Sequence, residues 1–145
     1  MRNTPPTYFY IGILIAAIPY FLLPQFNMIP FPFNWLGLLL LLAGLLLNML
    51  AIKEFEKHNT PHNFATTTTL VNSGLYKFSR NPIYLGMALG LVGIAILFQN
   101  PVSMLAPLFF LLVLEFKFIP YEEEKLTLEM GEAYLQYKQR VRRWI

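Results

Sequence analysis

The sequence contains no cysteine among its 145 residues. Disulfide bonds, thiolate metal sites and a cysteine nucleophile are therefore excluded. Charge is also scarce, because charged residues make up 13% of the chain and hydrophobic residues 56%, whereas soluble domains carry roughly 25% charged residues. This composition indicates an integral membrane protein, and the length predicts a single domain over residues 1–145.

The positive charges that remain are few and scattered. The formal net charge of +3 is too small and too scattered to indicate a nucleic-acid partner. His58 and His62 have the four-residue spacing of a helical metal pair, but Pro61 lies between them and no third ligand is evident. We therefore expect no metal site.

Long hydrophobic runs dominate what is present. Four of them predict an all-α membrane bundle of four transmembrane helices: Tyr8–Leu23, Trp35–Ile52, Ile83–Phe98 and Val102–Ile119. A perpendicular span needs ~20 residues, with ~17 tolerated, so flanking residues must extend the first and third runs. Two other interpretations are core helices of a soluble protein, which would leave too little polar surface, and an N-terminal signal peptide, which lacks a convincing cleavage site before Pro24.

The connections between these runs differ in charge. Residues 24–34 and 99–101 contain no charged residue. Lysine and arginine fall in the central loop and the tail, at Lys53, Lys57, Lys77, Arg80, Lys125, Lys138, Arg140, Arg142 and Arg143. Because such residues favour the cytoplasmic side, we expect both termini and the central loop to face the cytoplasm, in what we expect to be a bacterial inner membrane.

The third and fourth runs are joined only by Gln99–Pro101, which predicts a tight antiparallel hairpin. This hairpin should bring residues 80–84 and 115–123 to the same depth. A guanidinium, several carboxylates and several phenols would then meet at the rim of an apolar bundle, as a site for an amphiphilic ligand. Small residues at Gly86, Gly90 and Gly93 should let a neighbouring helix approach closely.

Two helix boundaries can be read from local signals. Asn81 followed by Pro82 predicts a helix start, with Asn as the cap and Pro in the first turn. After Pro120 the pattern changes to that of an amphipathic cytoplasmic helix, whose apolar stripe is Leu126, Met130, Tyr134, Tyr137 and Val141. We expect this C-terminal helix to fold back over the central loop.

Two motifs are more specific than these patterns. "LVNSGLYKFSRNPIYLG" and "IPYEEEKLTLEMGEAYLQYKQRVRRWI" cover residues 70–86 and 119–145. Together they resemble the isoprenylcysteine carboxyl methyltransferase and phospholipid methyltransferase superfamily. The shared pattern is L-V-x-x-G-x-Y-x-x-x-R-[HN]-P-x-Y-x-G, then E-E-x-x-L, then G-x-x-Y-x-x-Y and a basic end.

The resemblance implies an integral membrane enzyme that uses S-adenosyl-L-methionine and takes a lipophilic acceptor from the membrane. Carried over by position, the cofactor-binding residues would be Leu70, Gly74, Tyr76, Asn81, Tyr84, Glu122, Glu123, Tyr134 and Tyr137. Arg80 would lie nearest the reacting group as a catalytic and substrate-binding residue, with Glu123 as the second catalytic residue. Arg142 or Arg143 would help to close the pocket on the substrate.

Two positions depart from the carboxyl-methylating members. Thr68 and Asn81 stand where those members typically have histidine, which fits the broader bacterial-type members better and leaves the acceptor open as a carboxylate, thiol or amine. Arg80 could hold an anionic head group in bidentate fashion, whereas an amine acceptor would require a base such as Glu122 or Glu123.

Several alternatives stay open at this stage. Glu115 lies about one turn inside an apolar run, where an ionisable side chain is expensive, and it could serve either a ligand or a structural pair with Arg80 or a tail arginine. Glu54, beside Lys53 and Lys57, is expected at a solvated helix end. The rival functions are an NADPH-dependent membrane reductase of the sterol-reductase type and a non-catalytic membrane interaction module.

Overall fold

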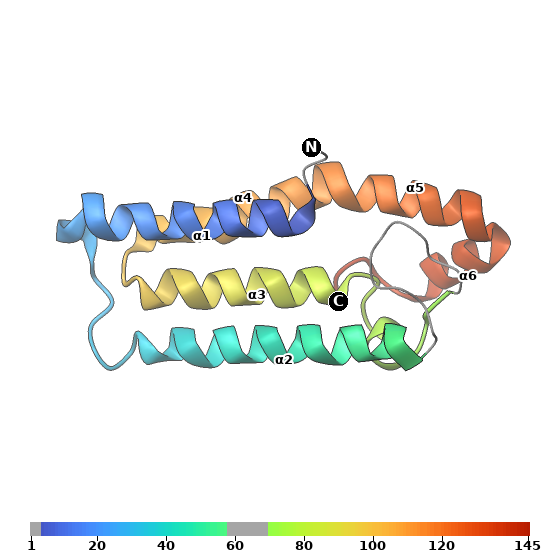
Figure 1. The fold of residues 1–145 in the computed structure, drawn as a ribbon, viewed down its shortest axis with the longest axis horizontal. Coiled ribbons are helices and arrows are strands. Elements are labelled where there is room, and N and C mark those ends of the chain that lie inside the picture. The colour runs from blue at the N-terminus through green and yellow to red at the C-terminus, as the bar shows by residue number, and fades with distance from the viewer. Residues whose placement is uncertain (1–3, 58–69) are drawn as a thin grey trace.

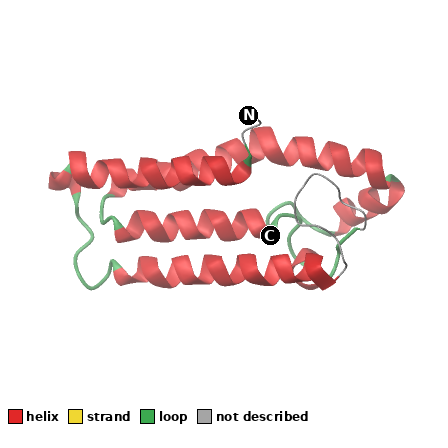
Figure 2. Ribbon diagram, viewed as in Figure 1, coloured by secondary structure: helices red, strands yellow, loops and turns green. Residues whose placement is uncertain are grey.

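The structure, a computed structural model, describes residues 4–57 and 70–145. These residues form helices and turns without any strand (Figure 2). The helices are α1 (Pro5–Leu22), α2 (Trp35–Lys57), α3 (Pro82–Leu97), α4 (Leu105–Val113), α5 (Ile119–Met130) and α6 (Glu132–Arg140). Shorter helical turns are η1 (Pro24–Phe26), η2 (Gly74–Lys77), η3 (Pro101–Met104) and the π-helical η4 (Leu114–Phe118). The all-α prediction is confirmed.

Within residues 4–57 and 70–145, three helical stretches are long and apolar enough to cross a membrane: Pro5–Leu22, Trp35–Lys57 and Pro101–Met130. α3 is equally apolar but has only 16 residues. These three stretches match the first, second and fourth predicted spans, and the third predicted span, Ile83–Phe98, corresponds to α3, which is shorter than a perpendicular crossing needs.

The long helices lie side by side, with α3 between α2 on one side and α1 and α4 on the other (Figure 1). α5 continues the direction of α4 beyond the other helices, and α6 turns back towards the start of α3. The C-terminus consequently lies beside the N-terminal end of α3, which is where the predicted site residues converge.

The close packing of α2 on α3 depends on glycine in both helices. A Cβ atom added at Gly93 would lie 2.4 Å from the Gly37 carbonyl oxygen, and one at Gly44 would lie 2.5 Å from the Gly86 carbonyl oxygen. Backbones this close leave no room for a side chain. The predicted small face of α3 is confirmed for Gly86 and Gly93, and its partner is a matching face on α2.

The turn between α3 and η3 is tight, as predicted, and it is anchored by a buried amide. The Asn100 side chain is fully buried and its Nδ2 atom donates hydrogen bonds to the Pro19 and Leu23 carbonyls and to Asn27 Oδ1, at 3.0–3.1 Å. Its Oδ1 atom accepts from the Val102 N–H at 3.0 Å. One side chain thereby joins the end of α1 to the α3–α4 connection.

The region after the apolar run differs from the prediction of one new helix after Pro120. The helix runs through Pro120 without interruption, from Pro101 to Met130. Proline offers no N–H and its ring displaces the carbonyl four residues earlier, and just before it the Ile119 N–H donates to the Leu114 carbonyl in a wider π turn. The helix instead ends at Gly131, where φ of 54° and ψ of −129° separate α5 from α6.

Candidate functional site

Arg80 is placed by the start of α3. Asn81 occupies the predicted cap position and Pro82 the first turn, but the Asn81 side chain makes no cap hydrogen bond. Its Nδ2 atom donates instead to the Arg143 carbonyl, at 3.0 Å. The Arg80 N–H donates to the Arg142 carbonyl at 3.0 Å, so residues 79–81 are held against the C-terminal segment, residues 141–145.

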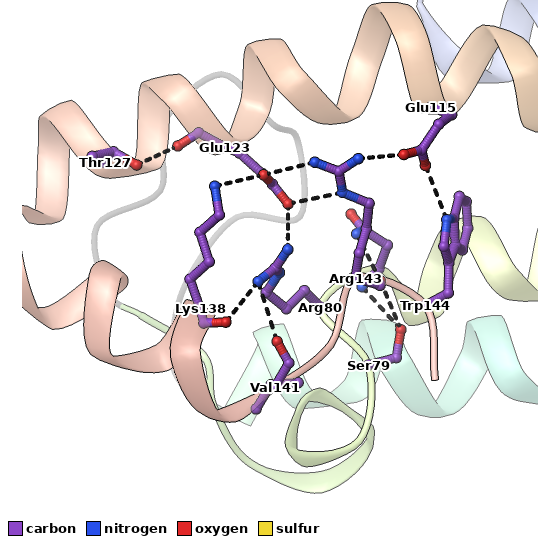
Figure 3. Close-up of polar contacts among 10 residues, drawn as sticks. Ser79, Arg80, Glu115, Glu123, Thr127, Lys138, Val141, Arg143 and Trp144 are labelled. Carbon is purple, nitrogen blue, oxygen red and sulfur yellow. Dashed lines mark hydrogen bonds and ion pairs between the residues drawn. The ribbon is translucent and has the colours of Figure 1, made fainter.

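The Arg80 guanidinium is buried and faces α5 (Figure 3). Its Nη2 atom lies 2.7 Å from Glu123 Oε1, and both side chains are less than a tenth exposed. Its Nη1 atom donates to the carbonyls of Lys138 and Val141, at 2.9 and 3.2 Å. The Nε atom is buried without a hydrogen-bond partner. The predicted meeting of Arg80 with the Glu-Glu motif is confirmed.

Arg143 extends this network towards α4 (Figure 3). Its Nη2 and Nε atoms lie 3.0 and 3.2 Å from the Glu123 carboxylate, and its Nη1 atom pairs with Glu115. The Trp144 indole N–H donates to the other Glu115 oxygen at 3.0 Å. Lys138 adds a third cation, 2.9 Å from Glu123 Oε2. Glu115 is thus paired with a tail arginine, one of the two partners that the sequence left open.

The π turn explains how one arginine reaches both carboxylates. In a regular helix each residue turns by about 100°, so residues seven apart share a face. The single wide turn at η4 adds one residue, which brings Glu115 into line with Glu123, eight residues later. Glu122 consequently points elsewhere, and it accepts a hydrogen bond from the buried Tyr84 hydroxyl.

A pocket lies between η2, the start of α3, α5 and α6. Its lining includes most of the residues predicted to bind the cofactor: Leu70, Tyr76, Asn81, Tyr84, Glu122, Glu123, Tyr134 and Tyr137, together with Arg80. The remaining lining residues are Phe55, Val71, Ile83 and Leu126. The structure therefore joins the two sequence motifs in one cavity that has apolar walls, aromatic rings and a charged edge.

Three other predicted residues lie outside the lining of this pocket. Gly74, with φ of 54°, packs behind it against Glu54. Arg143 lies at its charged edge through Glu123. The Arg142 side chain is exposed, and its carbonyl is the group that contacts Arg80. Ligand-binding roles for these residues stay predictions.

The tyrosines at this site resist ionisation. Burial raises the pKa of Tyr76 and Tyr137 well above the usual range, and burial with the nearby Glu123 charge raises the pKa of Tyr134 to about 12. The hydrogen bonds from Arg143 to Glu123 raise the pKa of the Arg143 guanidinium. At neutral pH the pocket therefore presents neutral phenols, and the Arg143 guanidinium at its charged edge stays a cation.

Sequence reasoning missed residues that carry no motif signal. Phe55 comes from α2, outside both motifs, and packs edge-on against Tyr76 with ring centroids 5.2 Å apart. Lys138 and Trp144 lie within the second motif, but at positions outside its shared pattern. Their distance from Glu115 and Glu123 in sequence hides the contact, which depends on the break at Gly131.

A sequence model of phospholipid methyltransferases matches residues 33–132. The chain belongs to this family. The match includes α2, α3, α4 and α5, and thus most of the pocket described above.

Curated relatives of this phospholipid methyltransferase family member are named as isoprenylcysteine methyltransferases. Protein-S-isoprenylcysteine O-methyltransferase A of Arabidopsis thaliana is 33% identical over 111 residues, covering 72% of this chain and 55% of the relative. The Saccharomyces cerevisiae protein is 28% identical over 140 residues, covering 90% and 58%. The Homo sapiens protein is 34% identical over 117 residues, covering 74% and 40%. The chain spans about half the length of these relatives, and no solved structure shows a significant match to it.

Proposed function

We propose that this chain is an S-adenosylmethionine-dependent methyltransferase that acts on a lipophilic or small membrane-accessible acceptor. The observation that carries the proposal is the single pocket in which Arg80, Glu122, Glu123 and the buried tyrosines converge. Family membership and the names of the relatives support methyl transfer. The acceptor group would be a carboxylate, a thiol or an amine.

The residues present fit this cofactor. An amino-acid carboxylate is a suitable partner for the buried and unsatisfied Nε atom of Arg80. The acidic Glu122 and Glu123 offer acceptors for ribose hydroxyls or amino groups, and Tyr76, Tyr134 and Phe55 offer aromatic surface to a purine. Bound S-adenosylmethionine supplies an electrophilic methyl group on a sulfonium.

The protein's own contribution is alignment and exclusion of water, since displacement at a sulfonium methyl needs little acid assistance. Arg80 is already fixed by Glu123 and by two carbonyls, so its charge can attract an anionic acceptor with little loss of side-chain freedom, while its Nε atom is the group assigned to the cofactor carboxylate. For an amine acceptor, Glu122 is the candidate base, because Glu123 is occupied by three cations.

A second hollow offers a place for the acceptor's hydrocarbon part. It is an apolar groove lined by Leu85, Leu111, Leu112, Glu115 and Trp144. Glu115 is bound by Arg143, which also binds Glu123 at the pocket. An acceptor whose hydrocarbon chain lay in this groove would have its head group at the ion-paired edge of the cofactor site. In this arrangement α3, although short, is proposed as the fourth membrane span of the bundle.

The proposed orientation follows from charge. The arginines and lysines of the site lie at one end of the helices, so we place this end, with both termini, at the cytoplasmic face of a bacterial inner membrane. The competing reductase is less well supported, because the described part of the pocket has no cluster of free cations for a 2′-phosphate. A non-catalytic module would not require buried polar groups around a cavity.

The test is ligand titration followed by methyl transfer. Purified protein in detergent should bind S-adenosylmethionine and its demethylated product, and it should not bind NADPH. A labelled methyl group should then enter one component of a membrane lipid extract, which identifies the acceptor. Binding of NADPH alone would favour the reductase, and binding of no nucleotide would favour the interaction module.

A further inference from the structure

Glu54 does not lie where its sequence context predicts. It stands among charged residues at the end of α2, yet the structure buries it, with a side chain that is 11% exposed. The expectation of a solvated helix end is therefore wrong for Glu54, although the neighbouring Lys53 and Glu56 are exposed. A buried carboxylate needs partners that compensate for its lost hydration.

The partners of Glu54 join α2 to the turn before the first motif helix. Ser73 Oγ donates to Glu54 Oε2 at 2.8 Å, and Lys57 Nζ lies 2.6 Å from Oε1. The same carboxylate lies directly against the backbone of Gly74, where an added Cβ would be 2.5 Å from Glu54 Cδ. The glycine at position 74 is thus required by the contact with Glu54 and by its φ of 54°.

This turn positions two tyrosines of the pocket wall, one within the turn and one bound to it. Tyr76, two residues after Gly74, is buried and lines the pocket. Its carbonyl accepts a hydrogen bond of 2.8 Å from the Tyr137 hydroxyl, which also belongs to the lining. The position of both tyrosines therefore depends on where η2 sits relative to α2.

We infer that Glu54 is a positioning residue that fixes the Gly74–Tyr76 turn on α2 and so sets the tyrosine wall of the ligand pocket. This inference deepens the proposed function, because the wall it sets is the one assigned to the cofactor. A simpler interpretation is a helix-end ion pair with Lys57, three residues away. The Lys57 side chain of that pair is 66% exposed, and ion pairs with an exposed partner contribute little to stability. The hydrogen bond from Ser73, in contrast, joins Glu54 to a residue 19 positions away in the sequence.

The first experiment needs no ligand. Since the chain has no cysteine, Lys53→Cys and Lys77→Cys can carry a pair of spin labels on exposed positions of α2 and η2. Double electron–electron resonance should give a narrow distance distribution that broadens in Glu54→Ala and stays narrow in Glu54→Gln, which keeps an oxygen for Ser73. Ser73→Ala should broaden it to a smaller degree, and the exposed control Glu56→Gln should leave it unchanged.

The second experiment connects the turn to the pocket. Binding of S-adenosylhomocysteine to the unlabelled chain should weaken about tenfold in Glu54→Ala, the effect of one lost hydrogen bond to a charged group, and Glu54→Gln should recover most of the affinity. Unchanged distances and affinity in Glu54→Ala and Ser73→Ala would overturn the inference. A parent chain that binds no S-adenosylhomocysteine would overturn the proposed function instead, while the distance measurement would still decide the role of Glu54.

Discussion

At the scale of single residues, Arg80 combines burial with unused bonding capacity. Its Nη atoms are engaged by Glu123 and by two carbonyls, and its buried Nε atom has no partner. A guanidinium held in this way is more specific than a flexible surface cation, since its planar donors are already oriented. The neighbouring tail offers a contrast in Arg142, whose side chain is exposed.

Replacing Arg80 should therefore affect both folding and ligand binding. Arg80→Ala leaves the Glu123 carboxylate without a buried partner, and such losses cost about 3–5 kcal/mol; Lys138 and Arg143 remain nearby and should hold the cost at the low end. We expect a lower midpoint of thermal unfolding in detergent and loss of methyl transfer. Arg140→Ala, which removes the same charge from an exposed position of α6, should change neither, and an Arg80→Ala protein with normal turnover would contradict the proposed role.

The sequence predicted which residues form this site better than it predicted their hydrogen-bond partners. The R-N-P and E-E motifs identified Arg80, Asn81, Glu122 and Glu123, because the hairpin had to bring them to one depth. The sequence did not indicate that the Asn81 side chain would donate to the Arg143 carbonyl and leave α3 without a side-chain cap. It also did not distinguish Glu122 from Glu123, since their different directions follow from the π turn before Pro120.

At the scale of elements, α2 and α3 approach each other closely enough for their backbones to meet. Glycines on both helices allow backbone atoms to meet, as at Gly93 and Gly37. Periodicity in the sequence indicated the glycine face of α3 but not its partner, because α2 is hydrophobic on every side and Gly37 and Gly44 do not stand out there. Which helix covers a small-residue face is decided by the tertiary arrangement.

Two alanine substitutions on α3 separate close packing from helix propensity. Gly93→Ala would place Cβ 2.4 Å from the Gly37 carbonyl oxygen, so we expect a loss of about 1–3 kcal/mol in unfolding free energy from overpacking. Gly90→Ala would meet only Leu41 Cδ1, at 3.6 Å, and should be neutral or stabilising by up to about 1 kcal/mol through helix propensity. Unfolding of both variants in detergent measures the difference, and equal effects would mean that α2 and α3 do not pack this closely.

At the scale of the whole molecule, the C-terminal segment closes the site end of the bundle. Residues 141–145 contact the start of α3 through backbone carbonyls and contact η4 and α5 through Arg143 and Trp144. The sequence indicated that the tail folds back, but it predicted one continuous helix. The break at Gly131 was not predicted, because the positive φ there is a property of the folded chain and not of glycine alone.

Removing this segment tests its part in the site. A chain ending at Arg140 lacks Arg143 and Trp144 and leaves Glu115 without these two partners. We expect its helical circular dichroism to persist, because the packing of α2 on α3 and of α1 on α4 does not involve the segment, while affinity for S-adenosylhomocysteine falls at least tenfold. Removal of the exposed Ile145 alone should have no effect. Full affinity in the shorter chain would show that the segment is not part of the binding site.

The buried amide of Asn100 has a consequence for how ligands enter and leave. It fastens α1, the following turn and the α3–α4 connection together at the end of the molecule far from the pocket. Helices that are fixed at one end separate most at the other, so exchange of bound molecules should proceed by a small divergence of α3 from the α4–α5 helix near Arg80 and Glu115. Amide hydrogen exchange should accordingly be slowest around Asn100 and fastest at the mouth of the pocket.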